Sequence, residues 1–129
     1  MLILGHPHIP HEKLYHVNSV EAIIHTPSNA TLLFEYNNEV FELVEHVKAN
    51  NIDFAMQVST LKDAILSESL DAKFILVAQE LSLAVQKAAD TYLFDAKILV
   101  SAQDDTSIEP LALNGIDGLI LPEAIIKVS

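Results

Sequence analysis

The chain contains no cysteine and no arginine, and it has only three glycines. Without cysteine there are no disulfides, no thiolate catalysis and no Cys-based zinc site, a composition typical of a cytoplasmic protein. Arginine is the favoured bidentate partner of phosphate and carboxylate, so its absence argues against a nucleotide or sugar-phosphate site. No glycine opens a strand-to-helix turn, so the P-loop and the dinucleotide-binding fingerprint are both missing.

Charge of one sign dominates the composition. Eighteen acidic residues face seven lysines, and the formal net charge is −11. This charge repels nucleic acids and anionic lipid surfaces. The first residues are too short an apolar run for a signal peptide, and no later run reaches membrane-spanning length. We therefore predict a cytoplasmic protein with no nucleic-acid partner and no membrane partner.

Half of the residues are apolar, and they are arranged as strands that alternate with helices. The segments 71–80 and 95–104 are similar to one another, and each carries an apolar run without polar alternation. Such a run is typical of a parallel strand covered on both faces. Apolar stripes predict helices between the strands, and one consists of Val40, Leu43, Val44 and Val47. The expected helix starts are Asn18 or Ser19, Thr60 and Ser107. Further strands are expected at residues 2–4, 14–17, 31–36, 53–58 and 118–121.

This pattern predicts a single α/β domain over residues 1–129. Residues 1–30 form a less regular segment with a His- and Pro-containing loop, and residues 31–129 form βα repeats. We expect a mainly parallel sheet of five to six strands with helices on both faces, in the doubly wound, flavodoxin-like arrangement. The alternative is a half (β/α)₈-barrel-like arrangement. It is suggested by residues 113–125, which resemble the closing unit of phosphate-binding (β/α)₈ barrels; a full barrel takes roughly 250 residues.

Ligand sites of parallel α/β proteins lie beyond the carboxyl ends of the strands. The residues expected there as ligand-binding candidates are Ser59, Gln79, Gln103, Asp104 and Asp105. No lysine is expected at this rim, which argues against anion binding and against Schiff-base chemistry. Asp104 and Asp105 are interpreted either as a Mg²⁺ or phosphoryl-accepting pair, as in response-regulator receivers, or as a solvated loop before a helix.

Three histidines lie close together near the start of the chain. His6, His8 and His11 form the pattern H-x-H-x-x-H, which resembles the opening metal motif of amidohydrolase-type barrels. That resemblance implies a divalent metal such as zinc or nickel. The alternative is a surface loop, because prolines stand at positions 7 and 10.

No cofactor is predicted beyond this divalent metal, and no set of catalytic residues is recognised. The first hypothesis is therefore a non-catalytic module that acts through protein–protein contacts or self-association, as a homodimer or other homo-oligomer. The second is a small-molecule or divalent-metal binding protein, extending to a metal-dependent hydrolase-like site on His6, His8 and His11. A third is a barrel-enzyme fragment that has lost its chemistry.

Overall fold

The computed structural model describes residues 1–128, and their strands form one all-parallel sheet of eight strands. The order across the sheet is β1-β7-β6-β5-β4-β3-β2-β8, so strands from the two ends of the chain form its edges. The strands are β1 (Leu2–Leu4), β2 (Leu14–His16), β3 (Thr31–Glu35), β4 (Phe54–Gln57), β5 (Phe74–Val77), β6 (Lys97–Ser101), β7 (Gly118–Ile120) and β8 (Ile125–Lys127). The predicted α/β class with a parallel sheet is confirmed.

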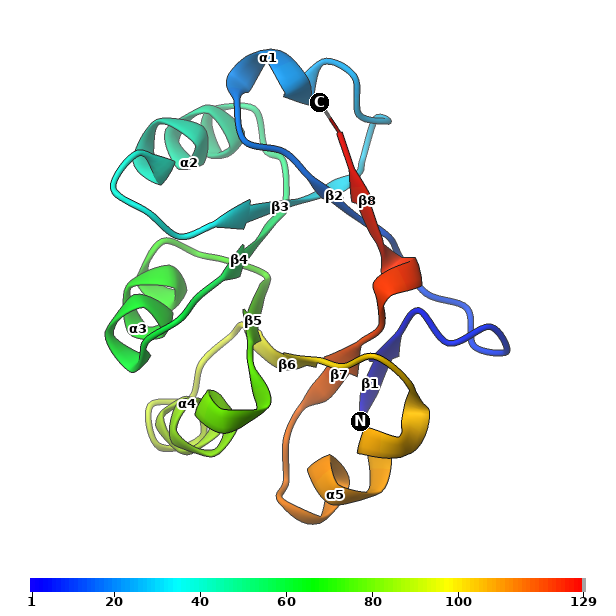
Figure 1. The fold of residues 1–129 in the computed structure, drawn as a ribbon. Helices are drawn as coiled ribbons and strands as arrows, with labels where there is room; N and C mark the ends of the chain where they lie inside the picture. Colours follow the sequence, from blue (N-terminus) through cyan, green and yellow to red (C-terminus); the bar gives the residue numbers. More distant parts are fainter. Residues whose placement is uncertain (129) are drawn as a thin grey trace.

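The sheet curls into a half-barrel, and the α-helices lie outside it (Figure 1). The helices are α1 (Val20–Ile23), α2 (Val40–Ala49), α3 (Leu61–Ser69), α4 (Gln79–Thr91) and α5 (Ile108–Leu113), with short 3₁₀ turns η1 (Asp105–Ser107) and η2 (Pro122–Ala124). The prediction of five to six strands with helices on both faces is wrong, and the half-barrel alternative fits. From β2 to β7 the strands follow one another without reversal, so right-handed crossovers place every helix on the same face. A doubly wound sheet needs a reversal of this order.

The two faces of the sheet bury separate sets of apolar side chains. Phe34 and Phe54, whose ring centroids are 5.7 Å apart, belong to the outer set that packs against the helices. Leu33, Phe74 and Leu99 belong to the inner set, which fills the concave side and includes no residue of α1 to α5. Both faces are therefore dry, which explains the continuous apolar runs of the sequence.

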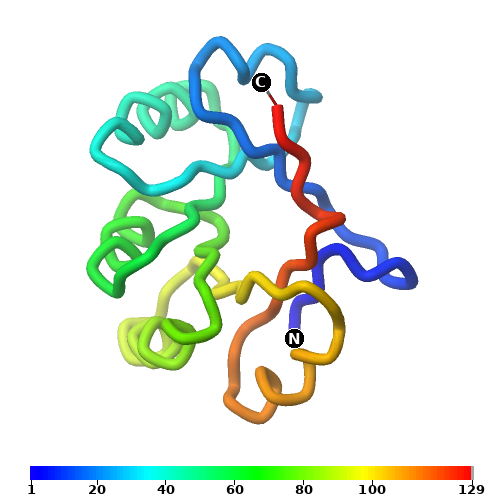
Figure 2. The backbone as a smooth tube through the Cα atoms, viewed as in Figure 1, coloured from blue at the N-terminus to red at the C-terminus, as the bar shows by residue number. Residues whose placement is uncertain are grey.

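The inner packing requires glycine at position 118. A Cβ there would lie 2.3 Å from the carbonyl oxygen of Leu2 and 2.9 Å from Cδ2 of Leu99. The missing side chain lets β1 and β6 approach β7 from both sides. Figure 2 shows the resulting course of the backbone, in which the first strand lies beside the late strand β7.

The βα repeat is visible in the way the helices end. After α2, α3, α4 and α5 one residue adopts the left-handed conformation: Asn51, Asp71, Leu93 and Gly115. The N–H of the following residue then donates to a carbonyl in the last turn, in the bonds Ile52→Val47, Ala72→Ser67, Phe94→Ala89 and Ile116→Leu111. This is the Schellman arrangement. Four aspartates precede or open strands, and they are not all equivalent. Asp71 occupies the left-handed position itself, whereas Asp53, Asp95 and Asp117 come two residues after it.

The helix starts are partly as predicted. Ser19 and Thr60 cap α1 and α3 by accepting bonds from backbone N–H groups three residues on. Ser107 makes no side-chain cap bond, although it was expected to cap a helix. The 3₁₀ turn η1 precedes α5, so the capping position moves back to Asp104. Among the described residues, no helix is both long enough and apolar enough to cross a membrane.

Leu93 provides a test of the repeated helix ending, because it holds a left-handed φ of 53° while its side chain is 84% exposed. We expect Leu93→Gly to raise the free energy of unfolding by about 0.5–1 kcal/mol, since glycine adopts this conformation without a Cβ clash. Gly115→Ala is the matched control. Its Cβ would meet nothing within 4 Å, so its expected loss of about 1 kcal/mol reports backbone conformation alone. Urea unfolding of both variants would measure this, and a destabilised Leu93→Gly would contradict it.

Candidate functional site

A hollow at the carboxyl edge of the sheet lies between the loop that follows β1 and the connection from β6 to α5. It has a volume of about 700 Å³. We call it the His-loop cleft; its lining residues are Gly5, His6, Pro7, His8, His11, Lys13, Gln103, Asp104, Asp105, Leu121 and Glu123. Gly5 and Leu121 are buried, and most of the polar side chains are exposed.

The cleft brings together two groups of residues that the sequence singled out separately. The three histidines of the loop face Gln103, Asp104 and Asp105, although about one hundred positions separate them. The strand order explains this proximity, because β1 and β6 both pair with β7 and so end at neighbouring points. The other two ligand-binding candidates, Ser59 and Gln79, are exposed at the ends of β4 and β5 and do not line this cleft.

His6 fastens the loop to the β6–α5 connection. Its Nδ1 accepts a hydrogen bond from the backbone N–H of His8 at 3.2 Å, and its Nε2 lies 3.4 Å from a carboxylate oxygen of Asp105. Because Nδ1 is an acceptor here, the proton of the neutral ring is on Nε2 and faces the carboxylate. Both ring nitrogens are thus engaged within the protein, and the side chain is only 19% exposed.

His11 has one nitrogen that the protein leaves without a partner. Its Nδ1 lies 3.1 Å from the carbonyl oxygen of Ile9, and since a carbonyl only accepts, Nδ1 carries the proton of this bond. Its Nε2 is buried, and it has no hydrogen-bond partner among the described residues. In the neutral ring this atom is a bare acceptor, and a buried acceptor without a donor is energetically costly.

Asp104 is the capping residue of η1. Its carboxylate accepts hydrogen bonds from the hydroxyl and from the backbone N–H of Thr106. These bonds, the hydroxyl bond first, hold the pKa of Asp104 below its usual value because they stabilise the charged form. Asp104 therefore shapes the wall of the cleft and stays ionised at neutral pH.

The three histidines do not form a preformed metal site. Within residues 1–128 no three His, Asp or Glu side chains are arranged so that they hold one ion. Glu12, next to the loop, turns away and accepts hydrogen bonds from the hydroxyl of Thr31 and from Nζ of Lys73. Metal binding by His6, His8 and His11 stays a prediction, and it requires the loop to rearrange.

The rim also carries a lysine that the sequence did not reveal. The prediction that no lysine stands there is wrong, because the unpredicted strand β8 ends in Lys127, directly beside His16 of β2. Glu35 and Gln57 are paired in the same way at the ends of β3 and β4. The start of β8 carries no separate signal, because Ile125 follows the 3₁₀ turn η2 directly. Only the strand order places Lys127 beside a histidine.

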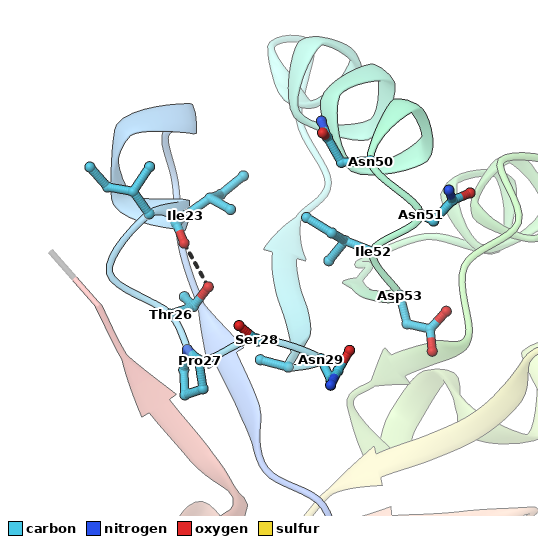
Figure 3. Close-up of a pocket in the computed structure, with 11 residues that line it drawn as sticks. Ile23, Thr26, Pro27, Ser28, Asn29, Asn50, Asn51, Ile52 and Asp53 are labelled. Carbon is cyan, nitrogen blue, oxygen red and sulfur yellow. Dashed lines mark hydrogen bonds between the residues drawn. The ribbon is translucent and has the colours of Figure 1, made fainter.

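A smaller cavity of about 390 Å³ lies at the opposite end of the sheet, between the ends of α1 and α2 (Figure 3). Its polar lining holds the chain in place. The hydroxyl of Thr26 donates to the carbonyl of Ile23 at 2.6 Å, and Asn50 donates to the carbonyl of His46 at 2.8 Å. Asn29 and Asn51 are in the left-handed conformation that asparagine tolerates. We therefore interpret the residues that line this cavity as structural groups that end the helices α1 and α2.

No protein-family model matches this chain, and no curated protein is significantly similar to it. Its function is therefore inferred from its own residues and their geometry.

The contact between His6 and Asp105 can be tested by a double-mutant cycle. We expect His6→Gln and Asp105→Asn to be coupled by about 0.2–1 kcal/mol in the free energy of unfolding at neutral pH, because the pair is partly exposed. Urea unfolding of the single and double variants would measure the coupling. The control cycle combines His8→Gln with Asp105→Asn. The side chain of His8 is not paired with Asp105 in the structure, so the effects of these two substitutions should be additive. Additivity in both cycles would contradict the contact.

Proposed function

We propose that the protein is a binding module and that the His-loop cleft takes a small organic cation, such as an alkylammonium group. The supporting observation is the kind of polar atom that the cleft offers. Asp105 and Glu123 contribute carboxylates, and His11, whose Nε2 accepts no hydrogen bond within residues 1–128, also lines the cleft. An ammonium group supplies both the positive charge and the hydrogen-bond donors that these atoms lack.

Electrostatics supports the same class of ligand. The net charge of −11 raises the local concentration of cations, and three carboxylates line the cleft against one lysine, Lys13. The lining of the His-loop cleft includes the buried residues Gly5 and Leu121, which suits the apolar part of an organic cation. The groups most suited to acid–base chemistry, His6 and Asp104, are occupied in holding the loop and the turn, which favours binding over catalysis.

The proposal predicts charge-selective binding. In an NMR titration of the ¹⁵N-labelled chain, butane-1,4-diamine should cause saturable shifts at the amides of residues 5–13 and 103–106, whereas butyrate should not. The double variant Asp105→Asn/Glu123→Gln should weaken the binding about fivefold or more, since it removes two partly solvated ion pairs of up to about 1 kcal/mol each.

The matched control is Glu42→Gln/Glu45→Gln, which removes the same charge from exposed positions of α2. It should bind the diamine as the unaltered chain does. An equal loss in both double variants would mean general charge attraction and would contradict a site. A parallel titration with Zn²⁺, with His8→Ala as the variant, tests the metal prediction separately.

A second candidate function is contact with another protein through the end of the half-barrel where the strands begin. The most exposed large apolar side chains lie at helix ends: Leu113 is 88% exposed, Leu93 84%, Ile24 78% and Tyr92 73%. Because each helix returns antiparallel to its strand, these ends all lie at the amino edge of the sheet. Exposed apolar side chains at one edge of the sheet favour an interface there.

This candidate predicts self-association that depends on those side chains. Light scattering as a function of concentration should show a species larger than the monomer, and Tyr92→Ser/Leu113→Ser should shift it toward the monomer. Leu83→Ser on α4 is the control, because Leu83 is exposed on the body of the helix and not at its end. A monomer at all concentrations, or an equal effect of the control, would contradict it.

A further inference from the structure

A second set of polar residues lies at the mouth formed by the carboxyl ends of β2, β3 and β8, away from the His-loop cleft. Leu14, Leu33 and Ile125 belong to the inner face of these strands. Side chains alternate along a strand, so residues two positions further on share that face. They are His16, Glu35 and Lys127. The mouth thus places an acid, a base and an imidazole above the apolar inner core.

Two cavities adjoin at His16. One, of about 250 Å³, is lined by Lys127, and the other, of about 360 Å³, is lined by Glu35 and Glu39. His16, Val17 and Asn18 line both cavities. Positive charge therefore stands on one side of His16 and negative charge on the other.

Neither charge is neutralised within the described part of the chain. Lys127 and Glu35 take part in none of the ion pairs formed within 4.0 Å among residues 1–128. Register explains the distance between them. Lys127 pairs with His16, His16 with Leu33, and Glu35 lies two residues beyond Leu33. With strands about 4.8 Å apart and a rise of about 3.3 Å per residue, the two Cα atoms are about 12 Å apart.

From this arrangement we propose that the mouth binds a short ω-amino carboxylate, with the carboxylate at Lys127 and the ammonium group at Glu35. A ligand whose charges are separated by a few methylene groups fits two opposite charges set apart across His16 and Asn18. Such a ligand is neutral overall, so the net charge of −11 does not repel it as it would repel a simple anion. The site is separate from the His-loop cleft, and either proposal stands without the other.

The test compares one bifunctional ligand with its two halves. In NMR titrations of the full chain, 4-aminobutyrate should shift the amides of His16, Asn18 and Asn37 in a saturable way. It should bind about tenfold more tightly than butyrate or butylammonium, because only the zwitterion contacts both charges. If 4-aminobutyrate gives no saturable shift, or binds no better than either half, the proposal is overturned.

Substitutions of the two exposed residues test which of them contacts each end of the ligand. Lys127→Gln should weaken 4-aminobutyrate about fivefold and leave butylammonium unchanged, and Glu35→Gln should weaken it equally and leave butyrate unchanged. Lys97→Gln, an exposed lysine at the opposite end of the sheet, is the control and should change nothing. Circular dichroism and unchanged amide spectra away from the mouth verify folding. If Lys127→Gln and Lys97→Gln have the same effect, the assignment of the carboxylate to Lys127 is wrong.

Discussion

The order in which the strands join the sheet determines the rest of the structure. From β2 to β7 each new strand is added on the same side of the previous one. Right-handed crossovers then leave all the helices on one face, and the other face would be open to water with Leu33, Phe74 and Leu99 on it. Curling the sheet lets these side chains bury one another. The half-barrel is therefore the way in which a sheet with helices on one side covers its second face.

The candidate site follows from where this regular pattern stops. The units from β3 to β7 are linked by α-helices, whereas β1 and β2 are linked by a loop and β7 and β8 only by η2. Neither of these two connections carries an α-helix. The His-loop cleft lies there, between the loop, η2 and the β6–α5 connection. The same irregular segments that interrupt the βα repeat thus line this hollow at the carboxyl edge.

Much of the fold could be predicted from local signals. The apolar runs located seven of the strands, and Ser19 and Thr60 marked two helix starts, because strand burial and N-capping depend on a few neighbouring residues. Strand order depends on contacts between distant residues, so neither the curl nor the meeting of His6 with Asp105 could be derived. A continuous apolar run indicates that both faces are dry, but it does not distinguish helices from the inner face of a curled sheet. Lys127 was not expected at the rim because its position there depends on the pairing of β8 with β2, two strands that are distant in the sequence.

The two ends of the half-barrel use their carboxylates differently. At the amino edge, Glu68 accepts hydrogen bonds from the backbone N–H groups of Asp95 and Ala96, and Asp117 accepts one from Ile98. Glu12 joins Thr31 to Lys73 at the same edge. These acids satisfy backbone or side-chain donors at the strand starts, so they contribute to stability. At the carboxyl edge, Glu35 is exposed, and the carboxylate of Asp105 contacts one imidazole on a surface that is mostly open. The acids named at the amino edge are thus bonded to the sheet, whereas Glu35 and Asp105 lie exposed at the edge where parallel α/β folds bind their ligands.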